Sequence, residues 1–171
     1  MYFSSISRLT VLLLSSYCFA AGSAETSHLQ SLAKSLSQSI HNVNTLNSDS
    51  NHKKIRAKFT NPGWRNLQLI MRKNGTNTLV HKHSLQQTID INGPIEVEKL
   101  DNDTNVWQLS VAADVQFNGP DMLIKQRVVD VYTVKEIDGS YRVINFREDI
   151  VDEPERLDKV AKHASSCPLN T

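Results

Sequence analysis

The sequence predicts an α+β fold in which a curved antiparallel sheet carries helices packed on one face. Apolar residues recur at helical spacing in the first half of the chain and alternate with polar residues, as in strands, in the second half. Helices followed by a run of long strands are typical of an α+β domain. The 171 residues suffice for one domain with a substantial core.

Residues 1–24 are predicted to be a signal peptide. Arg8 supplies a positive charge, and the mainly apolar run at 9–21 is shorter than the roughly 20 residues that a membrane-spanning helix needs. Small residues at 22–24 favour cleavage before Glu25, with an uncleaved anchor as the alternative. Tyr17 directly before Cys18 does not fit a lipid-attachment site.

The predicted mature chain, residues 25–171, has no net charge. Removing Arg8 leaves 19 minus 1 basic residues against 18 acidic ones, and this balance gives no reason to expect nucleic acid as a partner. Cys167 is then the only cysteine, so an intramolecular disulfide is excluded. The thiol is either inert or a site of intermolecular pairing.

Residues 25–54 are predicted to form an amphipathic helical arm and a linker. Within it, apolar residues are spaced by three and four over residues 28–46 (Leu29, Leu32, Ala33, Leu36, Ile40, Val43 and Leu46). This stripe needs a partner, either the sheet or another subunit. We expect the arm to be dispensable for folding of the core, and we expect Leu29 to Leu46, with any open sheet edge, to provide docking surfaces.

Turn-forming residues at 47–51 and a basic run at 52–58 follow the arm. The basic run is interpreted as a solvated face, with an anionic lipid or partner patch as the alternative. A second helix is predicted from Asn61, as cap, to about residue 73, with Pro62 in its first turn. Its apolar face includes Trp64, interpreted as a core anchor, and Gly63 is expected to allow a close backbone approach.

The rest of the domain is predicted to form strands. The clearest is Val106 to Phe117, because every second residue from Trp107 onward is apolar. A phase change in residues 122–137 predicts a bulge or a bend near Val128. The turn at 138–139 predicts a hairpin with residues 141–150. Shorter strands are expected at 85–91 and 95–98, and an acidic tail at 151–171 carries a short helical pattern.

Such an architecture often forms a cone with a cavity, as in the nuclear-transport-factor-like (cystatin-like) fold. That fold hosts enzymes, ligand binders and pure assembly modules, so it does not decide the function.

A more specific resemblance covers residues 55–150. Phe59 with Gly63 and Trp64 fits a Phe-x-x-x-Gly-Trp opening motif, Pro94 lies in a Pro-x-Val-like step, and Trp107 begins the central strand. Residues 74–80, 126–134 and 141–146 add to the match. In this order and spacing, the segment resembles the periplasmic domain of the DotI/IcmL family of type IVB secretion and conjugation proteins, which is related to plasmid TraM.

The resemblance implies a non-enzymatic periplasmic component, or an accessory paralogue, of a type IVB secretion or conjugation apparatus. Its partners would be other secretion-system subunits, with homo-oligomerisation possible through the domain, and no cofactor or metal is implied. Family members that act as inner-membrane components carry a full transmembrane helix, whereas this sequence shows only an apparent leader. No stable membrane insertion is therefore expected once the leader is removed.

Catalytic alternatives have little support in the sequence. His81-Lys82-His83 would place two imidazoles on one side of a strand, but a closed metal site normally has four ligands. Asp114 and Asp130 could each act as a base inside a cone cavity, although an exposed or paired carboxylate is the preferred interpretation of both. The open alternatives are a small-ligand-binding or enzymatic cone-fold protein and a secreted effector that shares only the fold.

Overall fold

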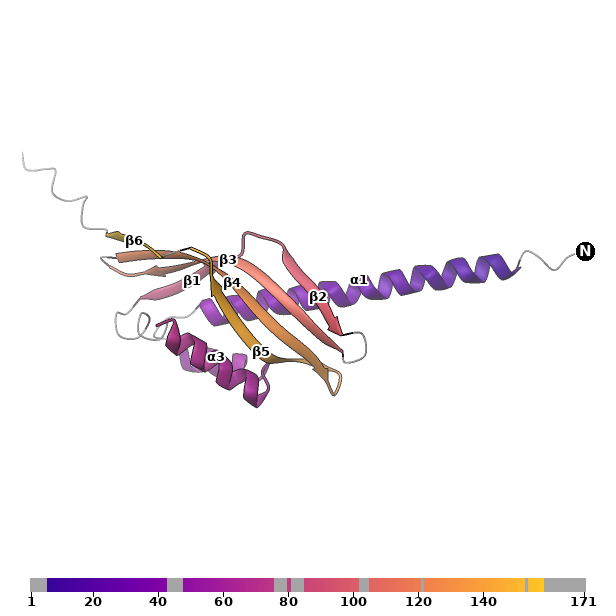
Figure 1. Cartoon of the computed structure of the whole chain (residues 1–171), viewed down its shortest axis with the longest axis horizontal. Helices are drawn as coiled ribbons and strands as arrows, with labels where there is room; N and C mark the ends of the chain where they lie inside the picture. Colours follow the sequence, from indigo (N-terminus) through magenta and orange to yellow (C-terminus); the bar gives the residue numbers. More distant parts are fainter. Residues whose placement is uncertain are drawn as a thin grey trace, which may run out of the picture.

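The structure is a computed structural model that describes residues 6–42, 48–75, 80, 85–101, 105–120, 122–152 and 154–158. These residues form three helices and six strands, which confirms the predicted α+β class (Figure 1). The helices are α1 (Ile6–His41), α2 (Ser48–Arg56) and α3 (Asn61–Lys73). The strands are β1 (Gln86–Asp90), β2 (Ile95–Asp101), β3 (Val106–Asn118), β4 (Met122–Ile137), β5 (Ser140–Ile150) and β6 (Glu155–Asp158).

All strand pairs in the sheet are antiparallel, and β3 and β4 form its centre. β1 and β2 both pair with β3, one after the other along its length, and β5 and β6 share the far edge of β4 in the same way. The β3–β4 ladder runs without interruption from the Val106–Lys135 pair to the Asn118–Leu123 pair. This long central ladder fixes which side chains of β3 and β4 face the helices.

The predicted alternation along β3 is confirmed. Every second side chain from Trp107 to Phe117 is buried, whereas those between them are partly exposed. Because register partners lie on the same face, the buried face continues on β4 through Val128, Asp130, Tyr132 and Val134.

The predicted hairpin between β4 and β5 is also present. Asp138 and Gly139 both have positive φ values, 51° and 70°, as a two-residue turn of type I′ requires. The bulge predicted near Val128 is wrong, because the ladder with β3 is unbroken there. The register shift lies instead on the β5 side of β4, between Thr133 and Val134.

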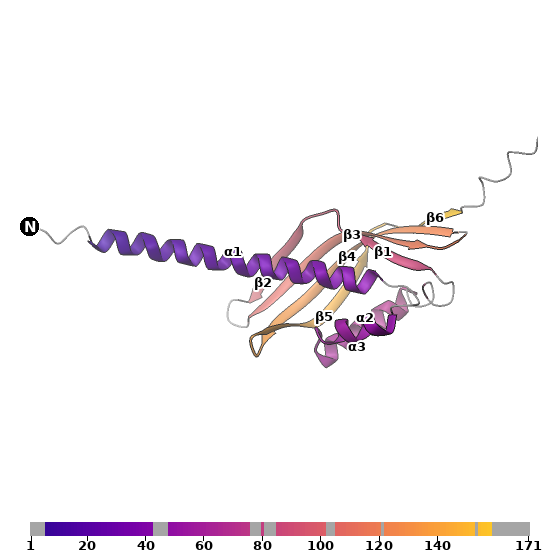
Figure 2. The same ribbon diagram turned by 180° about the vertical axis from the view of Figure 1, so that it is seen from behind.

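Helix α1 packs its apolar stripe against the sheet. Figure 2 shows its C-terminal half crossing one face of the sheet, while its N-terminal half projects beyond the strands. Four of its residues belong to the same core cluster as the inward-facing residues of β3 to β5 (Leu29, Ala33, Leu36 and Ile40). The described part of the stripe is therefore covered within the chain, which corrects the expectation that this part is a docking surface and argues against a dispensable arm.

Helix α3 packs against β5, and α2 packs against α1. The turn expected at residues 47–51 is wrong for residues 48–51, since α2 begins at Ser48, and residue 47 lies outside the described residues. Lys53 and Lys54 are exposed, as expected for a solvated basic face. The cap of α3 is Thr60 rather than Asn61, because the Thr60 side chain accepts the backbone N–H of Gly63 at 3.3 Å.

The C-terminal tail also differs from the prediction. Residues 155–158 form β6, which pairs with residues 122–125 of β4. The expected helical pattern begins within this segment, so its first residues are a strand instead. Val43, Leu46, His81, His83 and Cys167 lie outside the described residues. Within the described part of the chain, no helix is sufficiently long and apolar to span a membrane.

Candidate functional site

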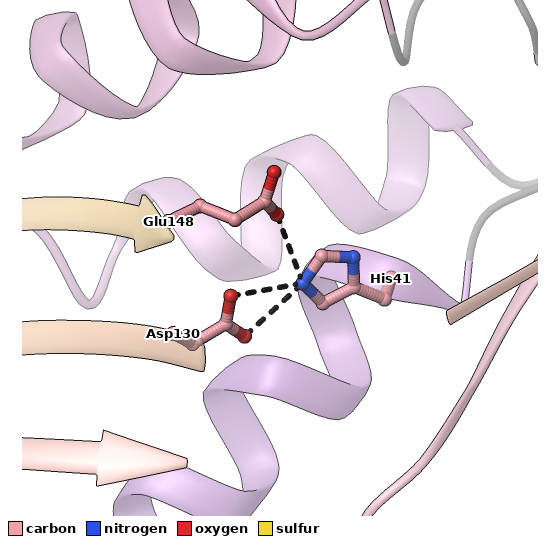
Figure 3. Close-up of side chains that lie close together, drawn as sticks. All are labelled: His41, Asp130 and Glu148. Carbon is pink, nitrogen blue, oxygen red and sulfur yellow. Dashed lines mark hydrogen bonds and ion pairs between the residues drawn. The ribbon is translucent and has the colours of Figure 1, made fainter. Parts of the chain in front are cut away.

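The most unusual group of side chains in the described structure is a buried cluster of His41, Asp130 and Glu148 (Figure 3). His41 is the last residue of α1, and Asp130 and Glu148 are register partners on β4 and β5. Their side chains are 1%, 0% and 5% exposed. The end of the helix therefore meets two neighbouring carboxylates on the inner face of the sheet.

One imidazole nitrogen faces both acids. His41 Nε2 lies 3.2 and 3.1 Å from the Oδ1 and Oδ2 atoms of Asp130 and 3.5 Å from Oε2 of Glu148. The contact with Asp130 is a charge-assisted hydrogen bond when the imidazole is protonated. The more distant Glu148 adds to the negative potential at the same nitrogen.

Neutral donors hold the two carboxylates in place. Ser37 and Tyr132 donate their hydroxyls to Asp130 Oδ2 at 2.7 and 3.0 Å, and the two hydroxyl oxygens lie 2.8 Å apart. Asn74, the C-cap of α3, donates its amide to Glu148. Residues from all of α1, α3, β4 and β5 thus meet at one polar centre inside the core.

The other imidazole nitrogen is paired with an amide. Nδ1 of His41 lies 2.8 Å from Nε2 of Gln87 on β1, and the Gln87 side chain is 1% exposed. The Oε1 atom of Gln87 is buried and has no hydrogen-bond partner. An unpaired buried acceptor is costly, so this end of the network differs from the satisfied Asp130 end.

Burial and charge act against each other on His41. Burial lowers its pKa, but the charge and hydrogen bond of Asp130, together with the charge of Glu148, outweigh this effect and raise the pKa above 6.5. Burial, followed by the charge of Asp130, raises the pKa of Glu148 despite the opposing effects of His41 and Asn74. Burial and Asp130 also raise the pKa of Tyr132 well above 10, so this hydroxyl stays a donor.

The cluster can hold a positive charge, as a proton or as a metal cation, but it offers no evident place for a substrate. His41 and Asp130 are almost fully buried and hydrogen-bonded to each other, and the remaining hydrogen bonds of the cluster go to surrounding side chains (Ser37, Asn74, Gln87 and Tyr132). General acid–base catalysis needs a proton-transfer partner within hydrogen-bond reach of the reacting group. The arrangement is therefore suited to joining α1 to the sheet.

The sequence motif residues Phe59 and Gly63 lie where α3 approaches β5. Phe59 is buried and forms a parallel bridge with Val143. A Cβ placed on Gly63 would lie 2.4 Å from the Val143 carbonyl oxygen. Only glycine fits this contact without a backbone shift, in agreement with the expected close approach.

The other three motif residues are separated. Trp107 is 3% exposed and stacks edge-on against Tyr141, with ring centroids 5.3 Å apart. Trp64 is only partly buried and makes edge contacts with Phe59 and His52, so the prediction that it is a core anchor holds only in part. Pro94 is exposed just before β2.

Sequence reasoning named Asp130 but missed His41 and Glu148. Asp130 is paired, as expected, and Asp114 also has a partner in Arg127 at 3.1 Å. His41 is separated from Asp130 by 89 positions, and no local spacing connects them. A signal was present at the end of the amphipathic helix, because Ser37 and His41 are four residues apart on its buried side.

Comparisons with known proteins identify the fold. No model of a known protein family matches the chain, and no characterised protein has a significantly similar sequence. Among solved structures, an IcmL-like type IV secretion system protein from Legionella pneumophila aligns with a TM-score of 0.66 and 17% identity, covering 75% of this chain and 94% of that one.

Two further structures align over a similar part of the chain. The periplasmic domain of DotI has a TM-score of 0.66 and 12% identity, covering 72% of this chain and 94% of its own. A periplasmic fragment of TraM has a TM-score of 0.59 and 11% identity, covering 72% of this chain and 98% of the fragment. The chain therefore has the fold shared by the DotI and TraM periplasmic domains and the IcmL-like protein, as its sequence resemblance implied.

Proposed function

We propose that this chain is a member of the DotI/IcmL family and a periplasmic component, or accessory paralogue, of a type IVB secretion or conjugation apparatus. The observation that carries the proposal is the structural match, which covers nearly all of three domains whose names place them in type IV secretion or in the periplasm. The match agrees with a resemblance read independently from the sequence. The predicted leader supports export, and the proposed role is non-enzymatic.

The packing of the inner sheet face supports action through protein contacts. A cone-fold enzyme or ligand binder needs a cavity, and ligand pockets are typically about 300–1,000 Å³ with mainly apolar walls. Here the inner face is filled by α1 and by aromatic and aliphatic side chains, among them Trp107, Tyr132 and Phe146. The polar cluster within that core is hydrogen-bonded to the side chains that surround it.

A surface hollow gives the ligand-binding alternative little support. It has a volume of about 260 Å³ and lies over β3 and β4, beside the chain that leads to β6. All of its lining residues carry a charged or an amide side chain (Asp114, Gln116, Lys125, Gln126, Arg127, Asp152 and Glu155). Arg127 is already paired with Asp114 and lies 3.8 Å from Asp152, so a ligand would have to break existing ion pairs.

The docking surface can be mapped from the exposed apolar residues. Leu69 on α3 is 58% exposed and Leu100 on β2 is 48% exposed. A photo-crosslinking amino acid at each position, expressed in the native host, should trap secretion-channel subunits from at least one of them. Val111, which is fully buried, provides the matched negative position. Equal labelling at all three positions, or adducts that lack channel subunits, would contradict the proposal.

A further inference from the structure

We propose that His41, Asp130 and Glu148 form a binding site for a divalent transition-metal cation, with zinc as the reference metal, which ties the end of α1 to β4 and β5. The site is distinct from the docking function proposed above and does not depend on it.

The charge of the cluster is unbalanced without a cation when both carboxylates are ionised. Two carboxylates and a neutral imidazole carry a charge of −2, and protonating His41 reduces it only to −1. Among the ion pairs of the described residues, His41 is the only cationic partner of Asp130 or Glu148. Buried charges are normally paired or bound to metals, and a divalent cation with neutral His41 would bring the sum to zero.

The spacing of the ligand atoms suits a metal. One ligand atom from each residue lies within 4.8 Å of the others, and His41 Nε2 is 3.1 and 3.5 Å from the nearest oxygens of Asp130 and Glu148. Zinc bonds of roughly 2.0–2.2 Å at tetrahedral angles separate neighbouring ligands by roughly 3.3–3.6 Å. His41, Asp130 and Glu148 would each supply one ligand atom, and a water molecule would complete the four-coordinate site.

The side chains behind the ligands resemble those of metal centres. Ser37 and Tyr132 donate to Asp130, and Asn74 donates to Glu148. A metal-bound histidine usually donates its second ring N–H to an oxygen. If the Gln87 amide is turned by 180°, its unpaired Oε1 takes the place of Nε2 beside His41 Nδ1 and would accept that proton. The orientation of a glutamine amide is assigned from its hydrogen-bond network.

The donor set favours the zinc class of metals. Imidazole suits zinc and its transition-metal neighbours, whereas calcium and magnesium prefer sites built wholly from oxygen. Because the ligands come from α1, β4 and β5, the bound ion would act as a crosslink between helix and sheet. Metal binding and folding would then be coupled.

The test uses the full chain without a polyhistidine tag, stripped with EDTA and titrated with zinc chloride by calorimetry and by thermal unfolding. We expect one equivalent to bind, and zinc at 100 times Kd to raise Tm by roughly 5–10 °C. His41→Gln and Glu148→Gln should each abolish that rise. The double variant His81→Gln/His83→Gln should keep it, which makes it the matched control for the His81-Lys82-His83 pair of imidazoles.

Absence of zinc binding to the unchanged chain would overturn the proposal and leave the cluster as a proton-held ion pair. Binding that survives in His41→Gln but disappears in His81→Gln/His83→Gln would overturn it equally. These decisive measurements do not depend on Asp130 variants, so a failure of Asp130→Asn to fold leaves the result unaffected.

Discussion

Replacing Leu36 by alanine should lower the free energy of unfolding by about 3–5 kcal/mol. Leu36 is 2% exposed and lies in the core cluster between α1 and the sheet. Removing three carbons costs roughly 2.4 kcal/mol in transfer free energy, and the remaining cavity adds to that cost. The loss would be a large fraction of the roughly 5–15 kcal/mol that stabilises a typical domain.

Urea and thermal unfolding, followed by the fluorescence of Trp64 and Trp107, provide the assay. For a chain of this size the loss corresponds to a decrease in Tm of roughly 6–20 °C. Lys34→Ala is the matched control, because Lys34 is exposed on the same helix and its loss should change stability by no more than about 0.5 kcal/mol.

A Leu36→Ala midpoint equal to that of Lys34→Ala would refute this reasoning. It would show that α1 contributes nothing to the core in solution and would restore the prediction of a dispensable arm. A lower midpoint with an unchanged dependence on urea would establish that the helix is part of the domain.

Three other outcomes are expected. Gly63→Ala should lower the free energy of unfolding by about 1–3 kcal/mol despite the better helix propensity of alanine, because the new Cβ would lie 2.4 Å from a backbone carbonyl oxygen. An increase in Tm would contradict the close approach of α3 to β5. Trp107→Ala should lower the free energy of unfolding by about 3–5 kcal/mol and Trp64→Ala clearly less, since only the Trp107 ring is fully buried. Equal losses of unfolding free energy in chemical denaturation would contradict this difference in burial. In EDTA, stability should be greatest below about pH 6.5 and fall as the pH rises through the raised pKa of His41, with the raised pKa of Glu148 acting in the same direction. The decrease between pH 6 and 8 should be smaller in His41→Gln, and an identical pH profile would exclude the cluster as its source.

Elements with a strong hydrophobic period were predictable from the sequence. Strand β3 alternates without a break from Trp107 to Phe117, and the stripe of α1 repeats at helical spacing. The sequence left open whether that stripe meets the sheet or another subunit. Periodicity shows that a face is buried but does not identify what covers it.

Features set by tertiary contacts were not predictable in the same way. The register shift belongs to the pairing of β4 with β5, and β6 forms because β4 extends beyond β5 and leaves residues 122–125 without a partner there. The polar cluster depends on bringing His41 to the inner face of the sheet next to Asp130 and Glu148. No local pattern encodes a contact between residues about 90 positions apart, so Asp130 could be named but its partners could not.

The most direct test of the account is affinity capture of the tagged chain from crosslinked envelopes of its native host, read by mass spectrometry. The Leu36→Ala variant, expected to be destabilised, serves as a control for capture that depends on the folded domain. Secretion-channel subunits should be recovered with the unchanged chain and depleted with the variant. Recovery of the chain alone, folded and without channel subunits, would contradict a role in the secretion apparatus.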